Sequence, residues 1–111
     1  MSVGGGGVRP WVVQRVSAVY LGFYVIAFAA TLMLSPVVDF VDWRERLSQP
    51  GINVATLLFV FALLAHAWVG LRDVIMDYVH SAALRFGLLS AIAIYFSAMA
   101  VWAMRILAGL W

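Results

Sequence analysis

The sequence contains no cysteine and no lysine, and it carries few charged residues of any kind. Without cysteine the chain can form no disulfide, no thiolate metal site and no thiol nucleophile. Charged residues make up 11% of its 111 positions, against roughly 25% in an average soluble protein. Its seven cations are all arginines and lie scattered along the chain. Because no basic run with interleaved aromatic residues is present, we expect no nucleic acid among its partners.

Hydrophobic residues are abundant, at 66% of the chain. A soluble fold of this length could not bury so much apolar surface, so the composition indicates that the lipid bilayer is the natural solvent. The sequence therefore predicts an all-α membrane protein. Residues 1–10 include four consecutive glycines and are expected to form a flexible leader rather than a signal peptide. Residues 11–111 are predicted to form a single transmembrane domain.

Three long apolar segments are predicted to span the membrane as helices. Twenty helical residues at ~1.5 Å each cover ~30 Å, the thickness of the hydrocarbon core. The segment Ser35-Pro36 ends the first span, since proline disfavours helix at the preceding residue. Between the first two spans, charged and apolar residues alternate around Trp43, a pattern typical of a segment lying in the membrane interface. The predicted spans are about residues 11–34, 52–71 and 82–110.

The arginines suggest an orientation for these spans. With three spans, the N-terminus and the second loop lie on the same side of the membrane. That side carries four arginines and the other side carries three. Cytoplasmic loops hold an excess of arginine and lysine, so we expect a multi-pass protein of the inner (cytoplasmic) membrane with a cytoplasmic N-terminus.

His66 lies inside the second apolar span, where an ionisable side chain is costly. Such a histidine faces a protein interior or a cofactor, and histidine is the commonest metal-ligand side chain. Ala62, Ala65 and Gly70 lie nearby and would let a neighbouring helix or a flat ring approach the backbone. The alternative is a buried histidine that is only bonded to a neighbouring helix.

Arg15 is expected at a similar depth on the same side of the membrane. His66 lies ~9 Å along its helix from Arg72, and Arg15 lies ~6 Å from Trp11. A ligand with a metal centre and an anionic edge would suit both side chains, and heme, with its iron and propionates, is such a ligand. The alternative for Arg15 is a side chain that extends to the lipid headgroups.

A polar stretch follows the second span and contains Asp77, Tyr78 and His80. His80 lies beyond the membrane end, so it is not expected to share one iron with His66. A heme with two axial ligands would need its second ligand from another chain, which predicts that this protein is part of a complex. The alternative for Asp77 and Tyr78 is a solvated loop with an interfacial tyrosine.

The residues after His66 resemble a known signature. With Gly70, Asp77, Tyr78 and Val79, they resemble the His-x-x-x-Gly…Asp-Tyr-Val pattern of succinate dehydrogenase membrane anchors. The similarity is to the small, hydrophobic D-type subunit of complex II. It covers the chain from about residue 8 to the end, and residues 13–18 resemble the start of that family's first helix.

This resemblance implies a role for each matching residue. His66 would be an axial ligand of heme b, with the other ligand from a second, C-type anchor subunit. Arg15 would pair with a heme propionate. Tyr78 would hydrogen-bond a carbonyl oxygen of ubiquinone, supported by Asp77. Electrons would come from succinate through a flavoprotein subunit and an iron–sulfur subunit.

Two other interpretations remain open at this point. One is an anchor of a quinol:fumarate reductase, which would differ in its catalytic subunits and direction of electron flow. The other is a non-redox membrane protein, such as a small assembly factor or half of a transporter. It predicts no heme and leaves His66 as a packing residue.

Overall fold

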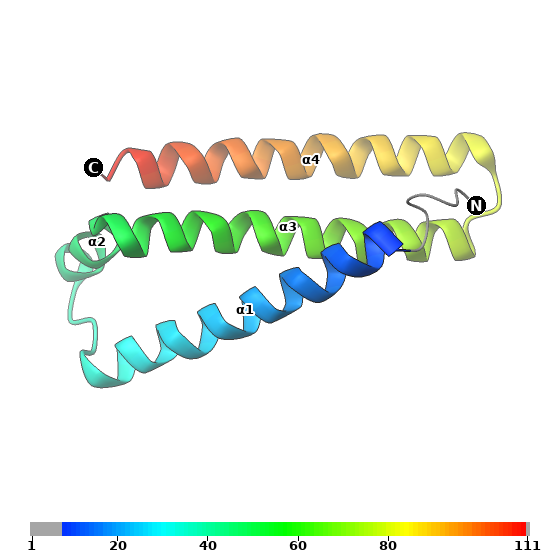
Figure 1. Cartoon of the computed structure of the whole chain (residues 1–111). Coiled ribbons are helices and arrows are strands. Elements are labelled where there is room, and N and C mark those ends of the chain that lie inside the picture. The colour runs from blue at the N-terminus through cyan, green and yellow to red at the C-terminus, as the bar shows by residue number, and fades with distance from the viewer. Residues whose placement is uncertain (1–7, 111) are drawn as a thin grey trace.

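The computed structural model describes residues 8–110 and consists of helices joined by short connections (Figure 1). The long helix α3 lies between α1 and α4, and it runs antiparallel to both. Both outer helices pack against α3, and the short helix α2 packs near its start. The helices are α1 (Val8–Leu34), α2 (Phe40–Ser48), α3 (Pro50–Tyr78) and α4 (Ala82–Ala108).

Three of these helices are long and apolar enough to cross a membrane. They contain 27, 29 and 27 residues, so each is ~40 Å long and exceeds the ~30 Å of the hydrocarbon core. Their ends therefore have the length to reach the headgroup layers. The prediction of an all-α membrane protein with three transmembrane helices is confirmed.

The helix boundaries differ from the predicted spans by more than two residues at the start of α1 and at the end of α3. Helix α1 begins at residue 8 and includes Pro10, which a first helical turn tolerates. The predicted leader, residues 1–10, therefore overlaps α1 at positions 8–10, and positions 1–7 lie outside the described residues. Helix α3 does not end near Leu71 but continues to Tyr78. The polar stretch is thus mostly helical, because it contains no proline or glycine to interrupt α3.

The ends of the helices have recognisable stop and start signals. Arg85 of α4 donates hydrogen bonds to the carbonyl oxygens of Met76 and Val79, at the C-terminal end of α3. These carbonyls have no partner within the helix, and a cation there is also favoured by the helix dipole. Asp39 accepts a hydrogen bond from a backbone N–H of the first turn of α2, and Ser81 does the same for α4. The predicted interfacial segment around Trp43 forms α2.

Polar and aromatic contacts hold α1 against α3. The hydroxyl of Tyr20 donates to the carbonyl oxygen of Ala55 at 2.7 Å. Tyr24 forms a hydrogen bond of 2.7 Å with Thr56, and its ring stacks on Phe59 with 4.3 Å between centroids. In lipid there is little hydrophobic driving force between helices, so such contacts carry much of the association.

Asn53 joins α2, α3 and α4 at the end of the bundle where α3 begins. Its side chain is 4% exposed, and its amide donates to the carbonyl oxygens of Leu47 at 3.0 Å and Leu107 at 2.9 Å. These carbonyls belong to the last turns of α2 and α4, where helix carbonyls often lack a partner, although that of Leu107 also accepts from the backbone N–H of Leu110 at 3.2 Å. The sequence prediction did not single out Asn53, although an amide inside an apolar span is a visible signal.

Replacing Asn53 with alanine should lower the stability of the assembled complex. The substitution removes the side-chain donor from both helix-end carbonyls and leaves that of Leu47 without a partner within residues 8–110, at an expected cost of about 1–3 kcal/mol. The measurement is the thermal denaturation temperature of the purified complex in detergent. Thr31→Ala is the matched control, because Thr31 is exposed and its hydroxyl bonds only within its own helix, to the carbonyl oxygen of Phe28. Equal denaturation temperatures for both variants would contradict this role for Asn53.

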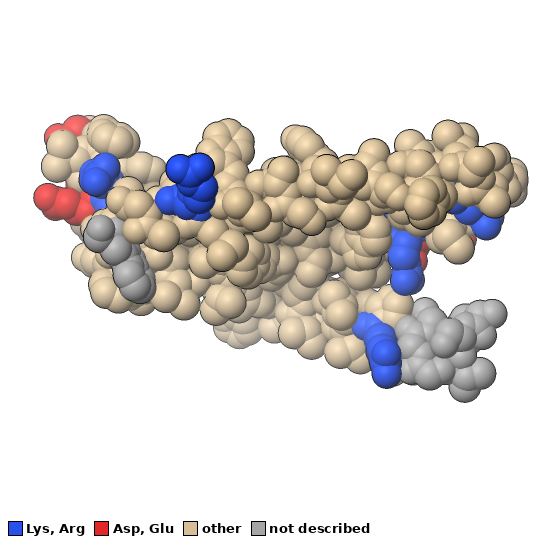
Figure 2. Space-filling view, turned by 90° about the horizontal axis from the view of Figure 1, so that it is seen from above, with Lys and Arg blue, Asp and Glu red and all other residues tan. Residues whose placement is uncertain are grey.

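Charged side chains gather toward the two ends of the molecule, with an uncharged stretch between them (Figure 2). The end that holds the start of α1 carries four arginines and two aspartates, whereas the other end carries three arginines and three acidic residues. Large apolar side chains are exposed along the middle, among them Phe23 and Ile94, each 71% exposed. This distribution is typical of a protein surrounded by lipid and other transmembrane helices.

Candidate functional site

His66 lies in α3 on the side that faces α1. Its Nδ1 forms a hydrogen bond of 3.1 Å with the hydroxyl of Ser17 in α1. Ser17 is buried, whereas His66 is partly exposed. The other ring nitrogen of His66, Nε2, has no hydrogen-bond partner within residues 8–110. The bond to α1 is the contact that the packing interpretation of His66 expects. It occupies only one of the two ring nitrogens, so the ring can also bind a ligand.

Small residues lie one turn on either side of His66. Ala62 and Gly70 share its face of α3, because positions four apart in a helix lie above one another. A methyl group placed on Gly70 would lie 3.9 Å from Nε2 of Gln14, so the side chain of Gln14 lies directly over this glycine. The small residues were predicted to let a helix or a ring approach the backbone of α3. At Gly70 it is helix α1 that approaches, through the side chain of Gln14.

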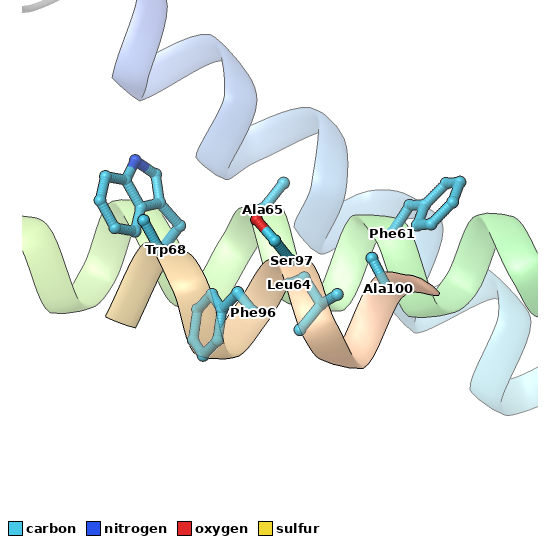
Figure 3. Close-up of a pocket in the computed structure, with 8 residues that line it drawn as sticks. Phe61, Leu64, Ala65, Trp68, Phe96, Ser97 and Ala100 are labelled. Carbon is cyan, nitrogen blue, oxygen red and sulfur yellow. The ribbon is translucent and has the colours of Figure 1, made fainter. Parts of the chain in front are cut away.

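Two apolar grooves are lined by residues close to His66, although His66 itself lines neither of them. The first, of about 530 Å³, runs between α1 and α3 and includes Ser17 and Ala62. The second, of about 420 Å³, lies between α3 and α4, and Figure 3 shows Ala65 and Trp68 of α3 opposite Phe96 and Ser97 of α4. Phe61 lines both grooves. This part of α3 thus offers open apolar surface on which a flat hydrophobic ligand or another helix can pack.

Arg15 does not contact His66 in this chain. It is exposed on α1, and its guanidinium lies over the ring of Trp11, 5.4 Å from the centroid. Ser17 comes two residues later and therefore points to a different side of the helix, toward α3. Arg15 borders a third groove together with Val16 and Tyr20, which also line the groove beside Ser17. A ligand extending around α1 would be needed to join Arg15 and His66, so their shared site stays a prediction.

Asp77 and Tyr78 form the exposed end of α3. Tyr78 is the last residue of the helix and is 77% exposed. Neither side chain forms a hydrogen bond with another residue in the range 8–110. Tyr78 lies twelve residues after His66, which corresponds to ~18 Å along the helix. The phenol is thus exposed at the end of a helix long enough to cross the membrane, where a ligand or a partner subunit can reach it.

The single imidazole of His66 fits a heme iron better than a free metal ion. Within residues 8–110 no group of three or more His, Cys, Asp or Glu side chains is placed to hold a metal ion. A single imidazole suffices for one axial position of a heme iron, while the porphyrin itself supplies the four equatorial nitrogens. The open apolar grooves beside the histidine suit the faces of such a ring.

Comparison with known proteins identifies the family. Residues 7–105 match the family described as succinate dehydrogenase/fumarate reductase transmembrane subunit. The chain belongs to this family. A member that it resembles is the succinate dehydrogenase hydrophobic membrane anchor subunit of Coxiella burnetii (strain RSA 493 / Nine Mile phase I), which is 29% identical over 101 residues. The aligned region covers 91% of this chain and 88% of the Coxiella protein.

Membership of the succinate dehydrogenase/fumarate reductase family confirms the resemblance seen in the sequence. The chain is a transmembrane anchor subunit, and such a subunit implies catalytic subunits as partners. The matched region contains the site candidates Arg15, His66, Asp77 and Tyr78. Ser17 was missed by the sequence prediction, although a hydroxyl within an apolar span next to Arg15 was visible.

Proposed function

We propose that this chain is the D-type membrane anchor of a succinate:ubiquinone oxidoreductase and that His66 is an axial ligand of heme b. The observation that carries this proposal is the environment of the imidazole. One nitrogen is held by Ser17, and the other has no protein partner among residues 8–110. An imidazole fixed through one nitrogen is the usual arrangement of a histidine ligand. When bound at His66, heme would supply a one-electron redox centre.

A second, C-type anchor subunit would supply the other axial ligand. Support comes from the single imidazole in the span and from the exposed apolar faces of α1 and α4, which leave ample surface for further helices. A flavoprotein subunit and an iron–sulfur subunit would deliver electrons from succinate. The larger number of arginines at the end that holds the start of α1, four against three at the other end, favours a cytoplasmic N-terminus in the inner (cytoplasmic) membrane.

Tyr78 and Asp77 would contribute to the site where ubiquinone is reduced. A quinone carbonyl oxygen needs a hydrogen-bond donor, and the exposed phenol of Tyr78 is one. The apolar tail of a quinone needs a hydrophobic path, and the groove at Trp68 lies ~15 Å from Tyr78 along α3. Asp77 precedes Tyr78 on the same exposed turn and has a supporting role.

The test of this proposal is a spectrum of the purified complex after reduction with dithionite, together with its succinate:quinone reductase activity. We expect b-type absorption bands and electron transfer from succinate to ubiquinone. A complex without b-type bands would show that this anchor holds no heme b and would overturn the role of His66 as a ligand. Bands accompanied by preferential quinol:fumarate reductase activity would instead identify a fumarate reductase anchor.

Arg15→Leu should weaken heme binding without abolishing it. Loss of a positive charge near a propionate should lower heme occupancy by less than about tenfold, or ~1.4 kcal/mol, because Arg15 is exposed on this chain. It should also shift the heme midpoint potential downward, since the reduced iron loses a stabilising positive charge. Heme content and redox titration measure both effects. Arg105→Leu, at the opposite end of the bundle, is the control, and identical results for the two variants would contradict the role of Arg15.

A further inference from the structure

The hydroxyl of Ser17 lies between two polar atoms. Its Oγ is 3.1 Å from the carbonyl oxygen of Gln14 and 3.1 Å from Nδ1 of His66. Ser17 is 6% exposed, so solvent does not compete for this hydroxyl. A serine hydroxyl has one hydrogen to donate, and a carbonyl oxygen can only accept. Both hydrogen bonds can therefore form together only when the second one is donated by His66.

This arrangement selects one tautomer of the imidazole. A serine within a helix commonly donates to the carbonyl three or four residues earlier, and the bond to Gln14 is of this kind. The contact with His66 then requires a hydrogen on Nδ1, for which Ser17 is the acceptor. A neutral imidazole carries one hydrogen, so Nε2 keeps its lone pair. This is the nitrogen that has no protein partner within residues 8–110.

We infer that Ser17 is a positioning residue that holds His66 with its hydrogen on Nδ1 and its Nε2 lone pair free for iron. The inference rests on the proposed function and extends it to a residue of α1. A partner on the second nitrogen of a histidine ligand fixes the orientation of the ring and raises its basicity. A more basic ligand stabilises ferric relative to ferrous iron. Ser17 therefore lowers the midpoint potential of the heme.

The test compares Ser17→Ala and Ser17→Thr in the purified complex. Ser17→Ala removes the acceptor and should shift the heme midpoint potential upward, the opposite direction to Arg15→Leu. It should also change the low-spin ferric electron paramagnetic resonance spectrum, which reports the axial ligands. Ser17→Thr keeps a hydroxyl at the same position and should retain the potential and spectrum of the wild-type complex. Ser48→Ala is the control, since Ser48 lies in α2, away from the grooves, and its hydroxyl donates within its own helix to the carbonyl oxygen of Glu45.

Each outcome bears on the inference. The inference would be supported by a shifted potential in Ser17→Ala. It would equally be supported if Ser17→Ala lost heme while Ser17→Thr retained it. An unchanged potential and spectrum in Ser17→Ala would overturn it while leaving the proposed function intact. Loss of heme from both Ser17→Ala and Ser17→Thr would also overturn the inference, because Ser17→Thr keeps the hydroxyl and should therefore keep the heme. A wild-type complex without b-type heme would overturn the proposed function and this inference together.

Discussion

Replacing His66 with leucine should remove most of the b-type heme from the purified complex. Leucine has no lone pair to offer the iron, and its apolar side chain remains compatible with a membrane helix. Loss of a partner that merely orients a metal ligand costs about 10–100-fold in metal affinity, so loss of the ligand itself should cost at least as much. The measurement is heme content per complex, with the dithionite-reduced spectrum of whatever heme remains.

The chain offers a matched control for this experiment. His80 is its only other histidine and lies exposed in the connection between α3 and α4. His80→Leu should retain the heme content and spectrum of the wild-type complex. If His66→Leu retained both as well, His66 would be no ligand, and its bond to Ser17 would be a packing contact between α1 and α3.

Replacing Tyr78 with phenylalanine should lower quinone reduction while leaving succinate oxidation intact. The substitution keeps the ring and removes only the hydroxyl. A hydrogen bond of this kind contributes about 0.5–1.5 kcal/mol, which corresponds to a loss of about twofold to tenfold in quinone reductase activity. Succinate oxidation with an artificial acceptor that takes electrons before the membrane should persist, because Tyr78 lies at the end of α3 and not in a catalytic subunit.

Tyr95→Phe is the control for this prediction. Tyr95 is also exposed, at 63%, but lies within the membrane-spanning part of α4. Its variant should keep both activities. A parallel fall of both activities in Tyr78→Phe in a fully assembled complex would show a structural effect instead. No change in either activity would return Tyr78 to the role of an interfacial anchor.

The sequence by itself determined the class of protein and its number of spans. A helix needs about twenty consecutive apolar residues to cross a bilayer, and the length of such a run can be counted directly in the sequence. The end of α1 at Leu34 follows from Pro36 in the same local way. The continuation of α3 to Tyr78 was missed, because charged residues such as Asp73 suit a helix that extends beyond the hydrocarbon core as well as they suit a loop.

The candidate site was only partly visible in the sequence. His66 stood out because an imidazole in an apolar span is costly, and the Asp77-Tyr78-Val79 match supplied the second landmark. Depth along the membrane normal also placed Arg15 on the side of His66. Depth does not determine direction around a helix axis, however, and Arg15 turned out to face away from His66, over Trp11.

Only the tertiary structure decided which faces of the helices meet. The bond between Ser17 and His66 joins residues 49 positions apart, and the bond from Asn53 to Leu107 joins residues 54 positions apart. Neither pairing follows from local composition, because in lipid almost any apolar face of a helix is tolerated. The packing of α1 and α4 on opposite sides of α3 selects among these faces (Figure 1). That choice brings a hydroxyl to one nitrogen of His66 and leaves the other nitrogen open.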